Sequence, residues 1–354
     1  MITSQSPPAI ESSRLNLLAL NFDETSALVE QLRWPAYRAQ QILRWLYQHR
    51  GREIASMSNL SKADRTRLQS IATINRTPAP TVMRSQDGTR KLVFSLDNNG
   101  VAIESVLIPD GPRLTLCLSS QVGCTVDCRF CLTGQMGLTR NLKAHEIVDQ
   151  VMTAQDLLAD GERITSLVFM GMGEPLANVN AVIEAIARLT NTQWGLGIPS
   201  RRITISTAGL APRLHAIAGL GVNLAISLNA STNEQRDRLM PIVNRLHPLS
   251  ELLKACRAYP LGRGRRLTFE YVLLRGENDS PDDAKRLSRL LEGIRCKINL
   301  IPFNEFPGSP FRRPSDEAIE KFQANLRRSG HAVLLRKSRG RDILGACGQL
   351  GNFP

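Results

Sequence analysis

The sequence of 354 residues lacks features that would place it in several common classes of protein. It has no run of 18 apolar residues, which excludes a membrane-spanning helix. Its first residues, MITSQSPPAIESSRLNLL, lack the basic start and the apolar stretch of a secretory signal, so we expect a cytoplasmic protein. Cysteine is scarce: there are seven, an odd number, and none precedes Cys117. In a cytoplasmic protein this argues against a disulfide framework.

Acidic residues are also few relative to basic ones. The chain has 45 Lys and Arg against 32 Asp and Glu, which gives a formal net charge of +13. Such an excess favours a polyanionic partner, of which nucleic acid is the commonest. A basic enzyme that binds no nucleic acid has the same composition, so charge alone leaves both interpretations open.

The pattern of apolar residues divides the chain into four parts. In order, these are a helical accessory domain, a β extension, a core and a C-terminal segment: 1–77, 78–109, 110–342 and 343–354. In the first part, one helix is predicted to be capped by Asp23 and to run through Leu32, a second lies within 36–50 and a third follows Asn59. The β extension predicts short strands in an antiparallel meander.

In the core, strand and helix patterns alternate six times. The predicted strands are 114–119, 164–170, 202–206, 222–228, 266–274 and 296–302. The predicted helices are 143–158, 178–190, 211–217, 248–258, 281–292 and 315–328. Continuous apolar strands such as SLVFM are typical of a parallel sheet that is buried on both faces. We therefore predict an α/β fold, its sheet curled into a barrel or left open, with the active site at the carboxyl ends of the strands.

The strongest chemical signal follows the first of these strands. Cys124, Cys128 and Cys131 form a C-x3-C-x2-C run. Three thiolates at this spacing can hold three irons of a [4Fe–4S] cluster, and without a fourth cysteine nearby one iron stays open to a ligand. A structural zinc site usually has four ligands, and this loop supplies neither a fourth cysteine nor a histidine. The run therefore predicts an open-site iron–sulfur cluster.

This cysteine run resembles that of the radical S-adenosylmethionine (AdoMet) family. A further match is GMGEPL at residues 171–176, which resembles the family's Gly-Glu-Pro motif. The resemblance implies a partial (βα)6 barrel in which the open iron binds AdoMet, and one electron splits AdoMet into methionine and a 5′-deoxyadenosyl radical. The motif suits this use, because glycines allow close backbone approach and Glu174 can complement an ammonium group.

Motifs along nearly the whole chain are similar to those of the RlmN/Cfr group of RNA adenine methyltransferases. They are RAQQILRWLY, NLSKADR, TLCLSSQVGC, TRNL, ISTAG, INLIPFN and RKSRGRDILGACGQL. The resemblance implies methylation of C2 of an adenosine in 23S rRNA and of the adenosine next to the anticodon in tRNA, through a methylated cysteine. It also implies an electron donor such as flavodoxin or ferredoxin, no membrane, and a monomer.

Two other functions stay open at this point. Methylation of the rRNA adenosine at C8 uses the same chemical motifs, so the motifs do not decide between the two carbons. A non-catalytic RNA-binding module that contains a metal would also be basic and rich in clustered cysteine. Such a module would have no need for Glu174 or for cysteines outside the cluster loop.

The resemblance also assigns catalytic roles to three residues. The counterpart of Cys347 is methylated by one AdoMet, and a radical from a second AdoMet converts this methyl group into a methylene radical that adds to the adenine. The counterpart of Cys117 resolves the adduct by forming a transient disulfide with Cys347, and that of Glu104 is the proton acceptor. The glycines at positions 345 and 348 predict an exposed loop that can bring Cys347 to a base.

AdoMet contacts can be carried over from the group in the same way. They fall on Gly173, Glu174, Ser206, Ser227, Leu228, Asn229 and Asn304. Most of these positions lie at the carboxyl ends of predicted strands, where ligands of this fold class bind. The sequence departs from the group at Asn229, where a histidine is usual.

Positive charge gathers in two stretches of the core. Residues 254–275 hold six Lys or Arg against one Glu, and residues 311–342 hold nine against four Asp or Glu. We expect both stretches to contact RNA phosphates near the active face, with the target base extruded into the barrel. The remaining cysteines, Cys256 and Cys296, match no motif and are expected to be buried apolar residues.

Overall fold

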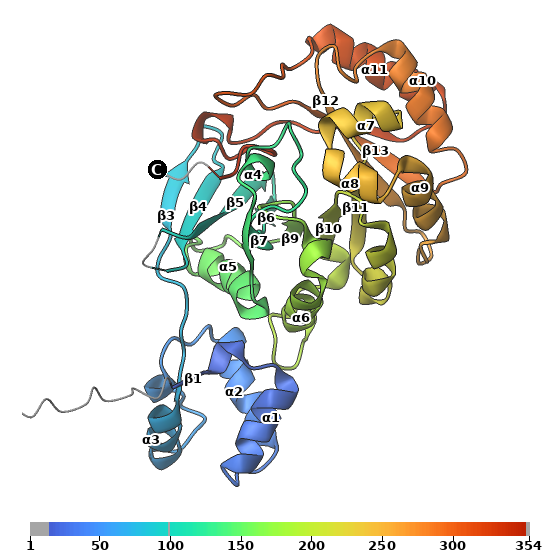
Figure 1. Ribbon diagram of the computed structural model, residues 1–354. Coiled ribbons are helices and arrows are strands. Elements are labelled where there is room, and N and C mark those ends of the chain that lie inside the picture. Colours follow the sequence, from blue (N-terminus) through green and yellow to red (C-terminus); the bar gives the residue numbers. More distant parts are fainter. Residues whose placement is uncertain (1–13, 98–99, 352–354) are drawn as a thin grey trace, which may run out of the picture. The chain divides into compact units, whose positions relative to one another are not determined.

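The structure is a computed structural model that describes residues 14–97 and 100–351 (Figure 1). It consists of two compact units. The first comprises the chain through Arg76 together with Thr192–Leu196, and the second comprises Thr77–Asn191 and Gly197–Pro354. Among the described helices, none is long and apolar enough to span a membrane.

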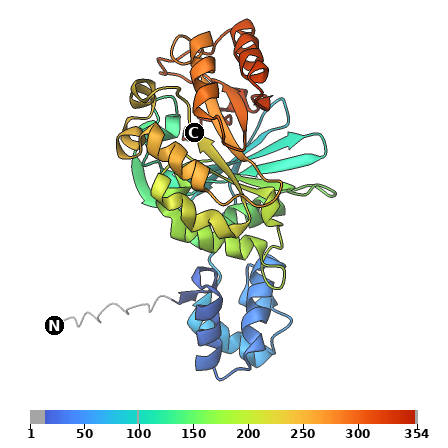
Figure 2. The same ribbon diagram turned by 90° about the vertical axis from the view of Figure 1, so that its right-hand side faces the viewer.

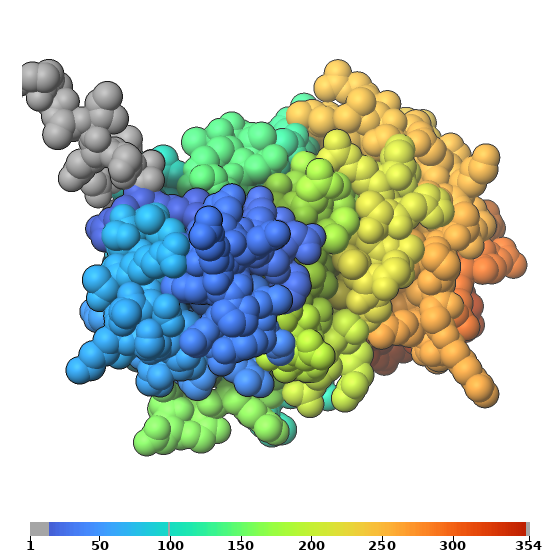
Figure 3. Space-filling model, turned by 90° about the horizontal axis from the view of Figure 1, so that it is seen from below, coloured from blue at the N-terminus to red at the C-terminus, as the bar shows by residue number. Residues whose placement is uncertain are grey.

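The described residues of the first unit up to Arg76 are mainly helical, and Figure 3 shows one face of this part in blue. Its elements are β1 (Leu15–Asn16), η1 (Leu17–Ala19), α1 (Phe22–Gln31), α2 (Tyr37–Tyr47), η2 (Ile54–Ser56), α3 (Lys62–Ile71) and β2 (Ala72–Thr73). The start of α1 differs from the prediction, because Asn21 rather than Asp23 is the N-cap. The Asn21 side chain accepts a hydrogen bond from the Glu24 N–H, and the Glu24 carboxylate accepts one from the Asn21 N–H.

A short stretch from far along the chain completes the core of this unit. Trp194 packs against Phe22 and Tyr47, with ring centroids 5.8 Å apart in each pair. Tyr47 is fully buried, as are Ile42 and Leu46 on the same face of α2. These aromatic contacts explain why Thr192–Leu196 belongs to the N-terminal unit.

A ten-stranded sheet forms the centre of the second unit (Figures 1 and 2). Its order is β14-β13-β12-β11-β10-β9-β6-β5-β4-β3. The parallel strands are β6 (Arg113–Cys117), β9 (Ser166–Phe169), β10 (Ile203–Thr207), β11 (Asn223–Ser227), β12 (Leu267–Leu273), β13 (Cys296–Pro302) and β14 (Val333–Leu335). Six of them lie where the alternating pattern predicts strands. The seventh, β14, was not predicted, because three residues are too few to show a periodicity.

The β extension continues this sheet through antiparallel pairs. It consists of β3 (Thr81–Arg84), β4 (Arg90–Ser95) and β5 (Ala102–Asp110), and β5 pairs with β6. Lys91 is paired with Val106, and Val106 is paired with Cys117. Glu104 lies two residues before Val106. Since alternate residues of a strand point to the same face, Lys91, Glu104 and Cys117 share one face of the sheet.

Helices connect the strands of the second unit. At predicted positions lie α5 (Ala144–Asp156), α6 (Val179–Thr190), η5 (Ala211–Leu220), α9 (Leu249–Ala258), α10 (Pro281–Leu290) and α11 (Asp316–Arg328), although η5 is a 3-10 helix. The other elements are β7 (Gln121–Gly123), α4 (Leu132–Gln135), β8 (Leu138–Asn141), η3 (Pro175–Asn178), η4 (Ser200–Arg202), α7 (Asn233–Leu239), α8 (Pro241–Leu246) and η6 (Arg341–Ile343). The sequence did not predict α7 and α8, because a proline divides this stretch into two helices too short to show a clear periodicity.

Candidate active site

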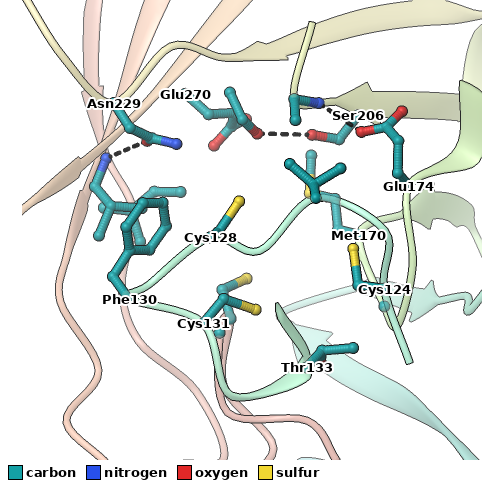
Figure 4. A pocket seen from close by; sticks show the side chains of 18 of the residues that line it. Cys124, Cys128, Phe130, Cys131, Thr133, Met170, Glu174, Ser206, Asn229 and Glu270 are labelled. Carbon is teal, nitrogen blue, oxygen red and sulfur yellow. Dashed lines mark hydrogen bonds between the residues drawn. The ribbon is translucent and has the colours of Figure 1, made fainter. Parts of the chain in front are cut away.

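The second unit contains a cavity of about 920 Å³, including its open mouth, at the carboxyl ends of the parallel strands (Figure 4). Ten of the residues that the sequence singles out line it: Cys124, Cys128, Cys131, Gly173, Glu174, Ser206, Ser227, Asn229, Asn304 and Cys347. They come from the cysteine loop, from the ends of four strands, and from the C-terminal segment. The fold thus brings residues more than 200 positions apart to one cavity.

Backbone contacts hold the cysteine loop in a tight turn. The Cys131 N–H donates to the Cys128 carbonyl at 2.9 Å, and the Cys124 N–H donates to the Gly137 carbonyl at 2.9 Å. A Cβ at Gly134 would lie 2.8 Å from the backbone nitrogen and oxygen of Cys128, so only glycine fits there. The three thiols are consequently presented from one short, closely packed turn.

The thiols of this loop lie in apolar surroundings. They contact a group of buried hydrophobic side chains that includes Val126 and Phe130. Burial raises the pKa of Cys124 to about 12, and burial together with the neighbouring thiols raises the pKa of Cys128. Such thiols are protonated unless a metal stabilises the thiolate.

The number and spacing of the three thiols fit one kind of metal group. A structural zinc site usually has four ligands, and this loop supplies three. In a [4Fe–4S] cluster each cysteine binds its own iron, so three cysteines leave one iron open to a ligand. The donor set and its spacing therefore fit the cluster.

The Gly-Glu-Pro motif is fixed by close packing at the end of β9. A Cβ at Gly171 would lie 2.6 Å from the Leu118 carbonyl oxygen, and one at Gly173, where φ is +96°, would lie 2.5 Å from Cβ of Gln121. Glu174 is 3% exposed, and its carboxylate accepts hydrogen bonds from the N–H groups of Leu176 (2.9 Å) and Ala208 (2.7 Å). Burial raises its pKa. Glu174 also lines the cavity, where its carboxylate can complement a cationic ligand.

The ends of β10 and β11 place two hydroxyls side by side. Oγ of Ser206 and Oγ of Ser227 are 3.5 Å apart, and both residues line the cavity. Leu228 differs from them, because its side chain is fully buried outside the cavity lining. Its N–H donates to the Glu270 carbonyl at 3.0 Å.

The structure gives a physical reason for asparagine at position 229. Its φ is +58°, in the left-handed region, which asparagine and histidine adopt more readily than most residues. The side-chain oxygen accepts a hydrogen bond from the Val272 N–H at 2.9 Å, as Figure 4 shows, and the amide lies 3.4 Å from Sδ of Met240. The side chain is therefore engaged with its neighbours while the residue lines the cavity.

The C-terminal segment packs on the cysteine loop. The prediction of an exposed loop around Cys347 is therefore wrong. Ala346 and Leu350 are buried, and Cys347 is half-buried. Asn304 donates a hydrogen bond from Nδ2 to the Cys347 carbonyl at 3.1 Å, and the Leu132 N–H donates to the Gly348 carbonyl at 2.8 Å. Cys347 thereby faces the cavity.

The other two predicted catalytic residues lie outside the cavity lining. Cys117 is a buried free thiol on β6, and burial, with Cys347 nearby, raises its pKa to about 12. Glu104 is fully buried on β5, where it forms an ion pair with Lys91 and accepts a hydrogen bond from the Gly351 N–H. The structure therefore places Glu104 beneath the C-terminal segment.

Three residues that sequence reasoning did not assign to the cofactor site also line the cavity: Met170, Glu270 and Arg336, the last of which was expected to contact RNA. Nη1 of Arg336 lies 3.3 Å from Sδ of Met170, and the nearby Cys347 raises the pKa of Arg336. Asn299 donates to both carboxylate oxygens of Glu270. A single glutamate within the apolar strand LTFEYVL was a signal that could have indicated Glu270.

The basic stretches are placed differently from the prediction. Five of the six cations in residues 254–275 precede β12, so they lie toward the amino ends of the strands, away from the cavity. In residues 311–342, Arg336 faces the cavity. Lys337 and Arg339 line a smaller neighbouring cavity, of about 340 Å³ with its open part, which shares Arg336, Asn304 and Cys347 with the larger one.

Comparisons with known proteins agree with this geometry. The family model described as Radical SAM superfamily matches residues 118–287, and that described as Ribosomal RNA large subunit methyltransferase N-terminal domain matches residues 15–74. The Dual-specificity RNA methyltransferase RlmN of Syntrophus aciditrophicus (strain SB) is 47% identical over 96% of this chain and 97% of its own length. The chain belongs to the RlmN family. The corresponding protein of Geotalea uraniireducens (strain Rf4) is 52% identical over 89% and 90%.

A solved structure confirms the predicted fold class. The crystal structure of a radical SAM methyltransferase from Sphaerobacter thermophilus superposes with a TM-score of 0.88 at 42% identity, over 95% of this chain and 99% of that one. As a member of this family, the chain is a radical AdoMet methyltransferase, and its cofactors are a [4Fe–4S] cluster and AdoMet.

Proposed function

We propose that this enzyme methylates C2 of a specific adenosine in 23S rRNA and of the adenosine next to the anticodon in tRNA. The observation that carries the proposal is that Cys347 lines the same cavity as the three-cysteine loop and Glu174. A metal-containing binding module would need no thiol at this place. The relatives' name, dual-specificity RNA methyltransferase, supports the substrate class.

In this proposal the cavity holds both cofactors. Cys124, Cys128 and Cys131 bind the cluster, which when bound supplies the electron for AdoMet cleavage. The AdoMet contacts are Gly173, Glu174, Ser206, Ser227, Leu228, Asn229 and Asn304. Leu228 contributes through its backbone alone, because its side chain lies outside the cavity.

The reacting groups of the chain have separate tasks. Cys347 accepts a methyl group from AdoMet, and its sulfur then carries the one-carbon unit to the adenine. Cys117 releases the product by forming a transient disulfide with Cys347, and both are free thiols in the structure. Glu104 accepts the proton from the adenine carbon. Because Gly351 and Lys91 occupy its carboxylate, this step requires the C-terminal segment to move.

The proposal also covers the domain organisation, the partners and the cellular location of the enzyme. Residues 1–77 are an accessory RNA-binding domain, followed along the chain by the β extension 78–109, the core 110–342 and the C-terminal segment 343–354. A protein such as flavodoxin or ferredoxin donates the electron. The enzyme acts as a monomer in the cytoplasm, away from membranes.

Nucleoside analysis tests the proposal directly. Mass spectrometry of 23S rRNA and tRNA from cells with and without the gene should show 2-methyladenosine in both RNAs only when the gene is present. Appearance of 8-methyladenosine instead would move the reaction to C8. The same nucleosides in both strains would contradict the assigned activity.

A further inference from the structure

A buried ion pair lies beside the cavity. Nζ of Lys91 is 2.8 Å from Oε1 of Glu104, and the two side chains are 1% and 0% exposed. They bridge β4 and β5 on the sheet face that also carries Cys117. Burying two charges costs about as much as their attraction returns, so stability alone is a poor explanation for such a pair.

The second carboxylate oxygen of Glu104 holds the C-terminal segment. The Gly351 N–H donates to Oε2 of Glu104 at 2.8 Å. Gly351 has a φ of +115°, and a Cβ at this position would overlap the sulfur of Met136. Glycine is therefore required here, in a backbone conformation that aims its N–H at the carboxylate.

Other hydrogen bonds dock the same segment, residues 346–351, onto the cysteine loop. Thr133 donates from Oγ1 to the Leu350 carbonyl at 2.6 Å, and the Leu132 N–H donates to the Gly348 carbonyl at 2.8 Å. These are bonds between neutral groups. The bond from Gly351 has a carboxylate acceptor, and bonds to charged groups are roughly twice as strong as neutral ones.

We propose that Lys91 is a positioning residue: it holds the Glu104 carboxylate, and Glu104 in turn anchors the segment that places Cys347 in the cavity. Cys347 lies four residues before Gly351, so the anchor limits where its sulfur can reach. The catalytic meaning rests on the proposed function. While the segment is docked, both Glu104 oxygens are occupied. The carboxylate becomes free to accept a proton only when Gly351 leaves it.

Hydrogen–deuterium exchange of the cluster-loaded full chain tests the anchor. Lys91→Met and Glu104→Ala should each speed exchange in a peptide spanning 340–351 by about tenfold or more, because a buried partner is lost. Glu104→Gln, alone or with Lys91→Met, should retain most of the protection, since its amide oxygen still accepts from Gly351. The rate at which AdoMet methylates Cys347 can be measured from the mass of the peptide that contains this residue. This rate should fall in Lys91→Met and Glu104→Ala and should be largely retained in the Glu104→Gln variants.

Arg90→Met is the matched control. Arg90 lies next to Lys91 on β4, and its replacement removes the ion pair that Arg90 forms with Glu162. Unchanged exchange in Glu104→Ala, or equal acceleration in Arg90→Met, would overturn the proposal. If the Lys91 and Glu104 variants do not fold, replacing the Leu350–Gly351 amide by an ester, through semisynthesis of the C-terminal peptide, removes the N–H donor without adding a side chain, and it must speed exchange or the anchor is refuted. Exchange requires no RNA, so an enzyme that methylates no RNA yet shows this pattern would refute the proposed function and not the anchor.

Discussion

The side-chain amide of Asn304 donates to the Cys347 carbonyl at 3.1 Å, while its side-chain oxygen is buried without a hydrogen-bond partner among the described residues. Burying an unsatisfied acceptor is unfavourable, and such groups often await a ligand. Asn304 lines the cavity. Asn304 therefore connects the segment that carries the Cys347 thiol with the place proposed for AdoMet. The ammonium and hydroxyl groups of AdoMet can donate a hydrogen bond to the unpaired side-chain oxygen of Asn304.

Replacing Asn304 by Ala should weaken AdoMet binding by about tenfold, because one buried hydrogen bond is lost. It should also slow methylation of Cys347, since the carbonyl of that residue loses its donor. Equilibrium dialysis with AdoMet and the mass of the Cys347 peptide measure the two effects. Asn325→Ala, at a half-buried position of α11 outside the cavity lining, is the control. Unaltered affinity would remove Asn304 from the AdoMet site.

A second prediction concerns the cluster. Anaerobically prepared protein should contain about four irons and four sulfides per chain, and Cys128→Ala should lose them together with all AdoMet cleavage. Cys256→Ala should keep both, because Cys256 is buried on α9 outside the cavity. Iron and sulfide assays and the visible spectrum check this. Stoichiometric zinc without iron would contradict the cluster assignment.

Local patterns sufficed to predict much of the fold and part of the site. Each parallel strand with a long apolar run was visible, and the spacing of Cys124, Cys128 and Cys131 is a property of one loop. The expected burial of Cys256 is confirmed, whereas Cys296 is half-exposed. The position of Cys347 could not be derived from local pattern, because it depends on hydrogen bonds to residues such as Asn304 and Leu132. Only the family resemblance indicated it.

Charge was the least informative signal. Arg336 and Lys337 are neighbours in one basic run, yet Arg336 faces the cavity while Lys337 is exposed. The difference arises because Arg336 follows β14, whose pairing with β13 no local pattern revealed: the Arg336 N–H donates to the Leu300 carbonyl. Likewise, the run before β12 looked suited to RNA until the strand direction placed it at the amino end.

The third prediction concerns acid stability. Burial opposes ionisation of Asp87, but hydrogen bonds from Thr89 and from the Gly340 N–H outweigh it and lower its pKa to about 2. A lowered folded-state pKa stabilises the fold above the unfolded value of 3.8, and this stabilisation is lost as the pH falls toward 2. Because Asp87 is exposed, Asp87→Asn should cost only roughly 1 kcal/mol at pH 7. Urea unfolding should show this difference shrinking below pH 4, and a difference independent of pH would contradict it.

The fourth prediction concerns RNA. Lys337 and Arg339 line the smaller cavity beside Cys347, so replacing both by Ala should weaken RNA binding and reduce its salt slope by roughly one per contact. Arg336 is left intact because it faces the cofactor cavity. Lys254→Ala with Arg257→Ala, on α9, should leave the slope unchanged. Filter binding at several salt concentrations measures the affinity and the salt slope of both double variants. A reduced slope in the Lys254/Arg257 variant alone would indicate that RNA binds at the amino ends of the strands.

The last prediction separates the two accessory cysteines. Cys347→Ala has no sulfur to carry the methyl group, so it should form no covalent bond to RNA. Cys117→Ala should still be methylated on Cys347 and still attack the adenine, because Cys117 lies on β6 outside the cavity lining. Lacking the thiol that releases the product, this variant should accumulate a protein–RNA conjugate that survives denaturation.

The double variant and a structural control complete this test. Changing both cysteines should abolish the conjugate, which denaturing electrophoresis of labelled RNA detects. Cys256→Ala, which removes another buried thiol, should release its product normally. A Cys117 variant that turns over and releases RNA like the unmodified enzyme would refute the division of labour between the two thiols. The assignment of the cavity to radical AdoMet chemistry would stand, because it rests on the cysteine loop and Glu174.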